Sequence, residues 1–185
     1  MRTYSRLLNP REFFPVELST LKTHLRIEHA DEDNYLIELL SSAVDFVEGL
    51  CGRSFAKQRR ETVVDGDLPL EFFLPQPPLI SIASFNAYSP TDVQTAVSSS
   101  IYVVDEEAGR LFLAANQSWP SDVRDQRSFV IQYDSGYGET SEYIPGTLKR
   151  AVLVVAANLY ENREQFMTDE ESVMRIIGQH MRNVL

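Results

Sequence analysis

Cysteine is almost absent from this sequence. Cys51 is the single one among 185 residues, so the chain cannot form an internal disulfide. It follows Leu50 at the end of an apolar helical pattern, and no lysine or histidine is adjacent in sequence to lower the pKa of its thiol. We therefore expect a buried and unreactive thiol. The redox compartment stays open, although a reducing cytoplasm is compatible with this cysteine content.

Long hydrophobic runs are also missing. The longest, residues 151–157, is far shorter than the roughly 20 apolar residues that a membrane-spanning helix needs. Residues 1–14 lack both a continuous apolar segment and a small-residue cleavage site, so no signal peptide is predicted. We expect a protein that has no membrane partner and stays in the cell that makes it.

Basic residues are outnumbered, with 17 lysines and arginines against 27 acidic residues and a net charge of -10. This balance disfavours a protein whose affinity comes from neutralising phosphates, and no helix-turn-helix with a basic recognition helix is evident. One local basic cluster stands out, formed by Arg53, Lys57, Arg59 and Arg60. It suits contact with nucleic acid or an acidic partner, but a solvated linker that enters a strand is the favoured interpretation.

Motifs for catalysis and metal binding are lacking as well. His24 and His29 are five residues apart, whereas a spacing of four places two ligands on one helix face. Residues 31–34 resemble the start of a calcium loop, but Leu36 stands where the glycine is required. The segment 136–138 lacks the third glycine of a dinucleotide fingerprint, and neither a Gly-x-Ser-x-Gly elbow nor a P-loop is present. We therefore expect no enzyme, metal or cofactor.

Two consecutive amphipathic helices are predicted within residues 15–55. The first starts near Ser19, with leucines at positions 18, 21 and 25 on one face. The acidic run 31–33 is expected to cap the second helix, and Gly52 is expected to end it. The apolar stripe of the second helix consists of Leu36, Ile37, Leu40, Ala43, Val44, Val47 and Leu50. Both helices must bury a face against another element.

From Gln58 onward, short strand-like segments alternate with turn residues, which indicates an antiparallel sheet or meander. The predicted strands are residues 60–64, 70–74, 81–88, 101–104, 110–113 and 129–133. Turns at residues 65–67 and 105–109 are expected to close two hairpins. The polar segment 89–100 is predicted to be an exposed loop or strand rim.

An apolar helix is predicted over residues 145–164, buried on more than one side, with Pro145 in its first turn. The remaining residues, 165–185, predict a short amphipathic helix that is marginal alone and orders on a partner. The expected fold is thus α+β: an N-terminal helical pair, a central antiparallel sheet, a buried C-terminal helix and a tail helix. We predict one domain over residues 1–164 and a tail segment over 165–185.

The order of the segments, taken together, resembles a known family. The segments are PVELSTLKTHLRI, DEDNYLIELLSSAVDFVEGLCGRSF, FLPQPPLISIASF, SWP, VIQYDSGYG and IPGTLKRAVLVVAANLYENRE. In this order they resemble the head-tail connector family of tailed bacteriophages, the adaptors that lie beneath the portal ring. The resemblance covers residues 15–164, and the tail 165–185 does not match the family.

The resemblance implies a structural subunit of the virion neck, made in the bacterial host cytoplasm. Twelve copies would form a ring that binds the portal on one face and a stopper or tail component on the other. The genome would pass through the lumen without specific binding, and an acidic lining would repel the duplex. Another neck component, either a stopper or a tail-completion protein, is the alternative that the sequence leaves open.

The residues predicted to contact neighbouring subunits and the portal are those expected to be exposed. We predict subunit contacts through the rim loop 89–100, with Asp92 and Val93, together with the basic cluster. The C-terminal segment is predicted to dock on the portal in the helix-in-groove manner, with Val173, Ile177 and Met181 as apolar anchors. An idle tail is the alternative. Trp119 is either an interface anchor or a packing residue.

Overall fold

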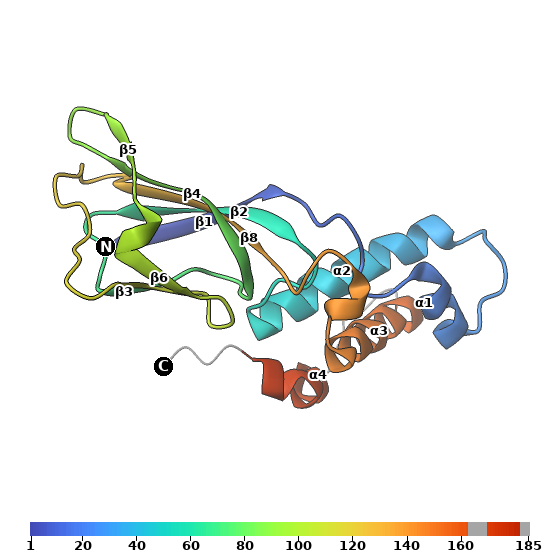
Figure 1. Cartoon of the computed structure of the whole chain (residues 1–185). Helices are drawn as coiled ribbons and strands as arrows, with labels where there is room; N and C mark the ends of the chain where they lie inside the picture. The colour runs from blue at the N-terminus through green and yellow to red at the C-terminus, as the bar shows by residue number, and fades with distance from the viewer. Residues whose placement is uncertain (163–169, 182–185) are drawn as a thin grey trace. The chain divides into compact units, whose positions relative to one another are not determined.

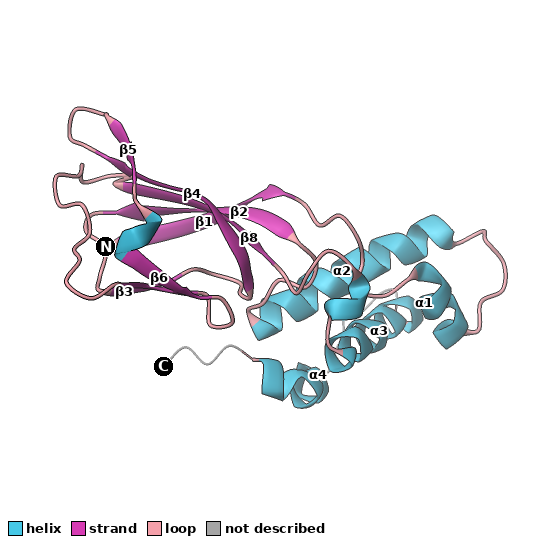
Figure 2. Ribbon diagram, in the orientation of Figure 1, coloured by secondary structure: helices cyan, strands magenta, loops and turns pink. Residues whose placement is uncertain are grey.

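The computed structural model describes residues 1–162 and 170–181 (Figure 1). Strands and helices both occur in this part of the chain, so the predicted α+β class is confirmed (Figure 2). The chain divides into two compact units. Residues 1–11 and 57–137 form the sheet unit, and residues 12–56 with the described residues from 138 onward form the helical unit.

The sheet unit contains all the strands of the described residues. They are β1 (Arg2–Asn9), β2 (Gln58–Asp65), β3 (Glu71–Phe73), β4 (Leu79–Tyr88), β5 (Gln94–Ala96), β6 (Tyr102–Asp105), β7 (Arg110–Leu113) and β8 (Phe129–Ser135), with a 3-10 turn at Ser99–Ile101. One sheet has the order β1-β2-β8-β4-β5, and the other has the order β3-β7-β6. All the strand pairs are antiparallel.

Strand β8 occupies the centre of the larger sheet. It pairs with β2 on one side and with β4 on the other, so that Ile131 lies between Thr62 and Phe85. The sheet is therefore antiparallel but is not a meander, since the last strand is inserted between two earlier ones. The core cluster of the unit includes Val64, Phe72, Leu74, Phe85, Leu111, Phe129, Ile131 and Tyr133, drawn from both sheets.

All six predicted strands are present, with bounds within two residues of those expected. The hairpin turn at residues 105–109 is confirmed, because β6 pairs with β7 and Asp105 lies opposite Arg110. The hairpin predicted at residues 65–67 is wrong. Strand β2 pairs with β1 and β8, while β3 pairs with β7 in the smaller sheet. Two strands were not predicted: β5, within the rim loop, and β1, whose side chains are nearly all exposed.

The helical unit is built from α1 (Leu18–Leu25), α2 (Asp33–Cys51), α3 (Gly146–Glu161) and α4 (Glu170–Ile177), with 3-10 turns at Ser141–Tyr143 and Gly178–His180. Helices α2 and α3 pack together through their apolar stripes. The fully buried members of these stripes include Leu36, Leu40, Val44, Val47, Leu148, Val152 and Val155. Most of the predicted stripe of α2 is thus confirmed, although Ile37 is 39% exposed.

The two ends of α2 differ in how well they were predicted. Gly52 adopts the left-handed conformation, with φ 66°, and ends the helix as expected. At the start, the acidic run supplies the N-cap position, Glu32, and an acidic first-turn residue, Asp33, as expected, but the Glu32 side chain makes no capping hydrogen bond. Glu32 instead accepts a 2.6 Å hydrogen bond from the Tyr160 hydroxyl, and Asp33 pairs with Lys22 at 2.6 Å. These contacts join α2 to α3 and to α1.

Cys51 lies in the interior of the helical unit, 1% exposed. Burial raises the pKa of its thiol to about 11, so the reactive thiolate is scarce at neutral pH. The expectation of a buried thiol is confirmed, and the raised pKa supports the expected low reactivity.

The C-terminal helix α4 packs against α3 and α2. Two of its apolar side chains, Val173 and Ile177, are buried, at 1% and 0% exposed. The prediction that this segment orders only on a partner is therefore corrected, since the helical unit itself supplies the packing surface. The boundary predicted at residue 164, and residues 165–169 and 182–185 of the predicted tail, lie outside the described residues. Within residues 1–162 and 170–181, each helix is too short or too polar to cross a membrane.

The turn between β6 and β7 depends on Gly109. Its φ of +68° is unfavourable for other residues, and a Cβ there would lie 3.0 Å from both the Leu74 carbonyl oxygen and Pro77 Cβ. Its carbonyl accepts a 2.7 Å hydrogen bond from the Leu74 amide. Close approach of two backbone segments therefore requires glycine at this position.

We predict that Gly109→Ala destabilises the protein more than Gly66→Ala does. Both glycines have positive φ, so both substitutions incur about 1–2 kcal/mol for a left-handed alanine. Only the substitution at Gly109 adds a steric clash, which should cost a further ~1–3 kcal/mol. Gly66 has open space around it. Urea unfolding of the two variants measures the difference, and equal losses would contradict the proposed close approach.

Candidate interaction surfaces

The predicted basic cluster is divided between the two units. Arg53 belongs to the helical unit, where its Nε donates a 2.7 Å hydrogen bond to the His180 carbonyl. Lys57, Arg59 and Arg60 belong to the sheet unit. The structure thus does not support one continuous four-residue patch within either unit.

Arg59 makes the best-defined ion pair of the sheet unit. Its Nε and Nη2 donate to the two carboxylate oxygens of Asp134 at 2.8 and 2.9 Å. These hydrogen bonds lower the pKa of Asp134 below its ordinary value, against the opposing effect of burial, and the charges of Arg59 and Lys57 act in the same direction. The Asp134 side chain is 9% exposed, so the pair joins β2 to β8 close to the interior.

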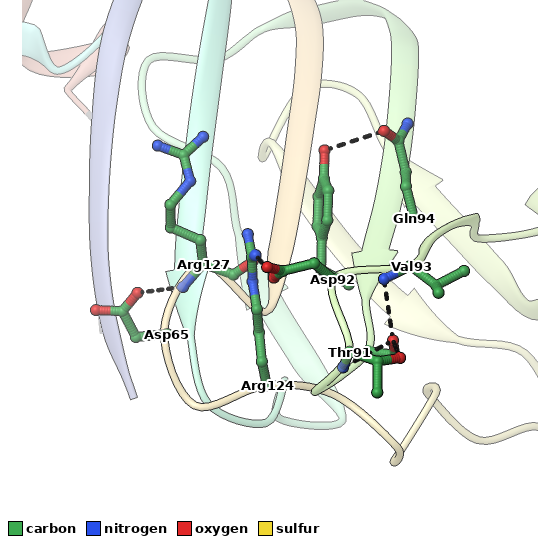
Figure 3. A network of polar contacts seen from close by, with 9 residues as sticks. Asp65, Thr91, Asp92, Val93, Gln94, Arg124 and Arg127 are labelled. Atoms are coloured by element: carbon green, nitrogen blue, oxygen red, sulfur yellow. Dashed lines mark hydrogen bonds and ion pairs between the residues drawn. The ribbon is translucent and has the colours of Figure 1, made fainter.

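The part of the rim loop between β4 and β5, residues 89–93, is held by a set of polar contacts around Arg124, shown in Figure 3 and called here the tip network. Arg124 forms an ion pair with Asp92, and its guanidinium lies 4.5 Å from the centre of the Tyr88 ring. The Arg124 amide also donates to the Tyr88 carbonyl at 2.9 Å. Asp92 is therefore engaged within its own chain, as part of the support of the loop.

The other contacts of the tip network fix the loop backbone. The Ser89 hydroxyl oxygen accepts hydrogen bonds from the amides of Thr91 and Val93 (Figure 3). The Arg127 amide donates to Asp65 at 2.8 Å, which ties the segment before β8 to the end of β2. Val93 itself remains 58% exposed. The tip network thus holds the loop in an ordered conformation in which the apolar side chain of Val93 is exposed. Sequence periodicity alone does not reveal this arrangement.

The C-terminal segment differs from the predicted set of exposed anchors. Val173 and Ile177 are buried, so neither is available on the surface of the helical unit. Met181 is half-buried. The segment is also fixed by polar contacts, because the side chains of His180 and Thr147 lie within 2.8 Å of each other. The expectation of exposed anchors at Val173 and Ile177 is corrected, and binding of this segment to a portal stays a prediction.

Trp119 is partly buried and packs against the core of the sheet unit. Its ring centre lies 5.7 Å from that of Phe85 and 6.2 Å from that of Tyr102, and its Nε1 donates to the Pro69 carbonyl at 2.7 Å. Of the two interpretations of this residue, the structure favours packing.

The helical unit contains an apolar pocket of about 480 Å³ that the sequence did not reveal. Its lining residues are Phe13, Phe14, Val16, Glu17, Leu18, Ile37, Leu40, Glu139, Thr140 and Ser141. Three separate segments of the chain meet there, so no single stretch of sequence carries its signature. The pocket combines apolar walls with the carboxylates of Glu17 and Glu139.

The smaller sheet has a partly apolar outer face. Phe73 and Val103 are 44% and 45% exposed, and the ladder places both on the same face as Phe112. Arg110 lies 5.2 Å from the centre of the Phe112 ring and pairs with Glu71 at 2.6 Å. The charge on this face is thus largely balanced within the sheet.

Metal-ligating residues do not gather in the described part of the chain. No group of three or more histidine, cysteine, aspartate or glutamate side chains is arranged to hold an ion within residues 1–162 and 170–181.

We predict that Ile177→Ala destabilises the protein by about 2–5 kcal/mol, because it removes a fully buried side chain from the contact of α4 with its neighbours. Arg175→Ala is the matched control, since Arg175 lies on the same helix with a side chain that is 74% exposed. It should change stability by less than about 0.5 kcal/mol. The free energy of unfolding in urea measures both, and an Ile177→Ala variant as stable as wild type would contradict the packed α4.

We also predict that Asp134→Asn lowers stability at pH 7 and that the loss disappears in acid. The pKa of Asp134 is lowered in the folded protein, so its stabilising effect is present above the ordinary value of 3.8 and is lost as the pH falls through the folded pKa. Urea midpoints of variant and wild type, measured from pH 7 to pH 2, should therefore converge at low pH. A difference that stays constant over this range would contradict the ion pair with Arg59.

No curated protein sequence matches the chain. Its fold is similar to a chain in the neck of an empty GTA particle reconstructed with C6 symmetry, at 20% identity, with a TM-score of 0.81 and coverage of 98% of this chain and 97% of that one. A chain of the native gene transfer agent virion has 18% identity and a TM-score of 0.81, covering 98% and 96%. A chain from the native GTA neck, reconstructed with C12 symmetry, has 18% identity and a TM-score of 0.78, covering 100% and 97%.

The sequence itself matches the profile of one protein family. The match runs over residues 16–174, from Val16 in the lining of the apolar pocket to Met174 within α4. Since this range contains most of the sheet unit and most of the helical unit, the chain belongs to the head completion protein family.

Proposed function

We propose that the protein is a structural component of the neck of a phage-like particle, where it joins the head to the tail. The match to the head completion protein family over residues 16–174 carries this proposal. Whole-chain fold similarity to chains of two GTA necks supports it. The role is structural, with no reaction and no cofactor.

The proposed assembly is a ring, with twelve copies in the particle. The two similar neck structures were reconstructed with C6 and C12 symmetry, which supports a cyclic arrangement. A cyclic ring needs a heterologous contact, in which two different surfaces of the subunit meet. The chain offers such different surfaces, among them the apolar pocket of the helical unit and the tip network of the sheet unit.

The ring would lie beneath the portal and enclose the channel through which the genome passes. Its net charge of -10 suits passage of DNA, because the protein as a whole repels the phosphate backbone. We propose that the side facing away from the portal binds a stopper or a tail component.

Contacts between subunits are proposed at the tip network, with exposed Val93 as an apolar contact and Asp92 as its support. A second proposed contact region consists of Lys57, Arg59 and Arg60. Of the three residues first predicted to dock on the portal, only Met181 escapes burial, so it alone is retained as a proposed contact.

We predict that the purified protein is small in solution and forms a ring of about twelve copies on the portal ring of the same particle. Native mass spectrometry of the chain alone, of the portal ring alone, and of their mixture measures this directly. Bovine serum albumin, which is also acidic, serves as the control for nonspecific binding to the portal. A chain that ignores the portal and binds the tail tube would instead identify a tail-completion protein.

A further inference from the structure

The negative charge of the chain is unevenly distributed. The sheet unit, residues 1–11 and 57–137, contains nine basic and eleven acidic residues and has a net charge of -2. The helical unit contains eight basic and sixteen acidic residues and has a net charge of -8. Most of the acidic excess therefore belongs to the helical unit.

Part of the sheet unit is strongly basic. The region of β1, β2 and β8 with the residues beside them, 1–11, 57–65 and 127–135, is called here the basic edge. It contains seven basic and three acidic residues, a net charge of +4 in an acidic protein. The basic residues are Arg2, Arg6, Arg11, Lys57, Arg59, Arg60 and Arg127, and the acidic residues are Glu61, Asp65 and Asp134.

Strand β1 forms the outer limit of the basic edge. It pairs with β2 on one side, and no strand of the described residues pairs with its other side. Its side chains are nearly all exposed, including Leu7 at 46%. Such an edge presents unpaired backbone groups and apolar side chains to a partner. Leu7 lies opposite Arg60 in the ladder, so an exposed apolar side chain is flanked here by positive charge.

The apolar pocket of the helical unit has the opposite character. Phe13, Phe14 and Ile37 contribute apolar surface, while Glu17 and Glu139 bring carboxylates to the same lining. Ile37 is 39% exposed, so part of the apolar wall faces solvent. Its volume of about 480 Å³ lies within the range of about 300–1,000 Å³ that is typical of binding pockets. An apolar side chain within a basic segment is the matching ligand.

We propose that the basic edge of one copy docks on the apolar pocket of a second copy, with Leu7 inserted into the pocket. This inference deepens the proposed ring and rests on that function. A second copy is the occupant because every chain carries both complementary surfaces, one basic and one acidic. The contact joins two different surfaces, so each copy binds one neighbour through its edge and another through its pocket, and the chain of contacts closes into a ring.

Disulfide trapping tests this contact in solution. Leu7→Cys and Ile37→Cys are prepared as separate variants, and the native Cys51 is kept because it is buried with a raised thiol pKa. Mixed under mild oxidation, the two variants should form a disulfide-linked heterodimer at least tenfold faster than a control mixture. The control pairs Ile37→Cys with Val103→Cys, because Val103 is 45% exposed and lies outside the basic edge.

The double variant, Leu7→Cys with Ile37→Cys, should produce a ladder of linked oligomers, since each copy carries both halves of the contact. Formation of the heterodimer should slow at about 1 M salt, where the screening length is only about 3 Å. A double variant that forms only a disulfide within one chain would overturn the proposal. So would a heterodimer that forms no faster than the control, or at a rate independent of salt.

The experiments distinguish failure of this contact from failure of the proposed neck function. A ring that assembles on the portal from the double variant, Leu7→Cys with Ile37→Cys, but forms no disulfide between neighbouring copies would overturn this contact and leave the neck function intact. Crosslinked ladders from a chain that ignores the portal would support the contact and contradict the neck function.

Discussion

The double pairing of β8 is the constraint on which the rest of the sheet unit depends. Phe129, Ile131 and Tyr133 enter the core from this strand, while its neighbours β2 and β4 come from much earlier in the chain. The Tyr133 hydroxyl donates to the Pro75 carbonyl at 3.0 Å, so even its polar end is used inside the unit. Long-range pairing of this kind sets the register of both neighbours, because a one-residue slip would turn the apolar side chains outward.

The surfaces proposed for assembly depend on this central strand. The segment before β8 brings Arg124 and Arg127 into the tip network, and β8 itself carries the Asp134 that holds Arg59. With β8 and β2 in place, β1 is left as an edge strand on the basic side of the sheet. The helical unit provides an acidic surface with an apolar pocket. A subunit with two unlike surfaces is what a closed ring of identical copies requires.

Local sequence signals predicted much of the fold. Helix periodicity identified α1, α2 and α3, and the turn residues at 105–109 identified the hairpin of β6 and β7. The order of strands was not predictable in this way, because insertion of β8 depends on contacts between distant segments. Strand β1 escaped detection since its exposed residues show no apolar alternation, and the apolar stripe of α4 was misread because packing on a partner and packing on α3 demand the same pattern. The pocket was missed for a related reason: its wall is assembled from segments near residues 13–18, 37–40 and 139–141.

The central claim is that this member of the head completion protein family is a ring-forming subunit of the particle neck. Cryo-electron microscopy of the neck, in the particle whose genome encodes the chain, tests this claim most directly. We expect twelve copies of the α+β subunit in one ring, in contact with the portal and enclosing the channel. Density for the chain in the tail tube alone, or its absence from the neck, would contradict the account.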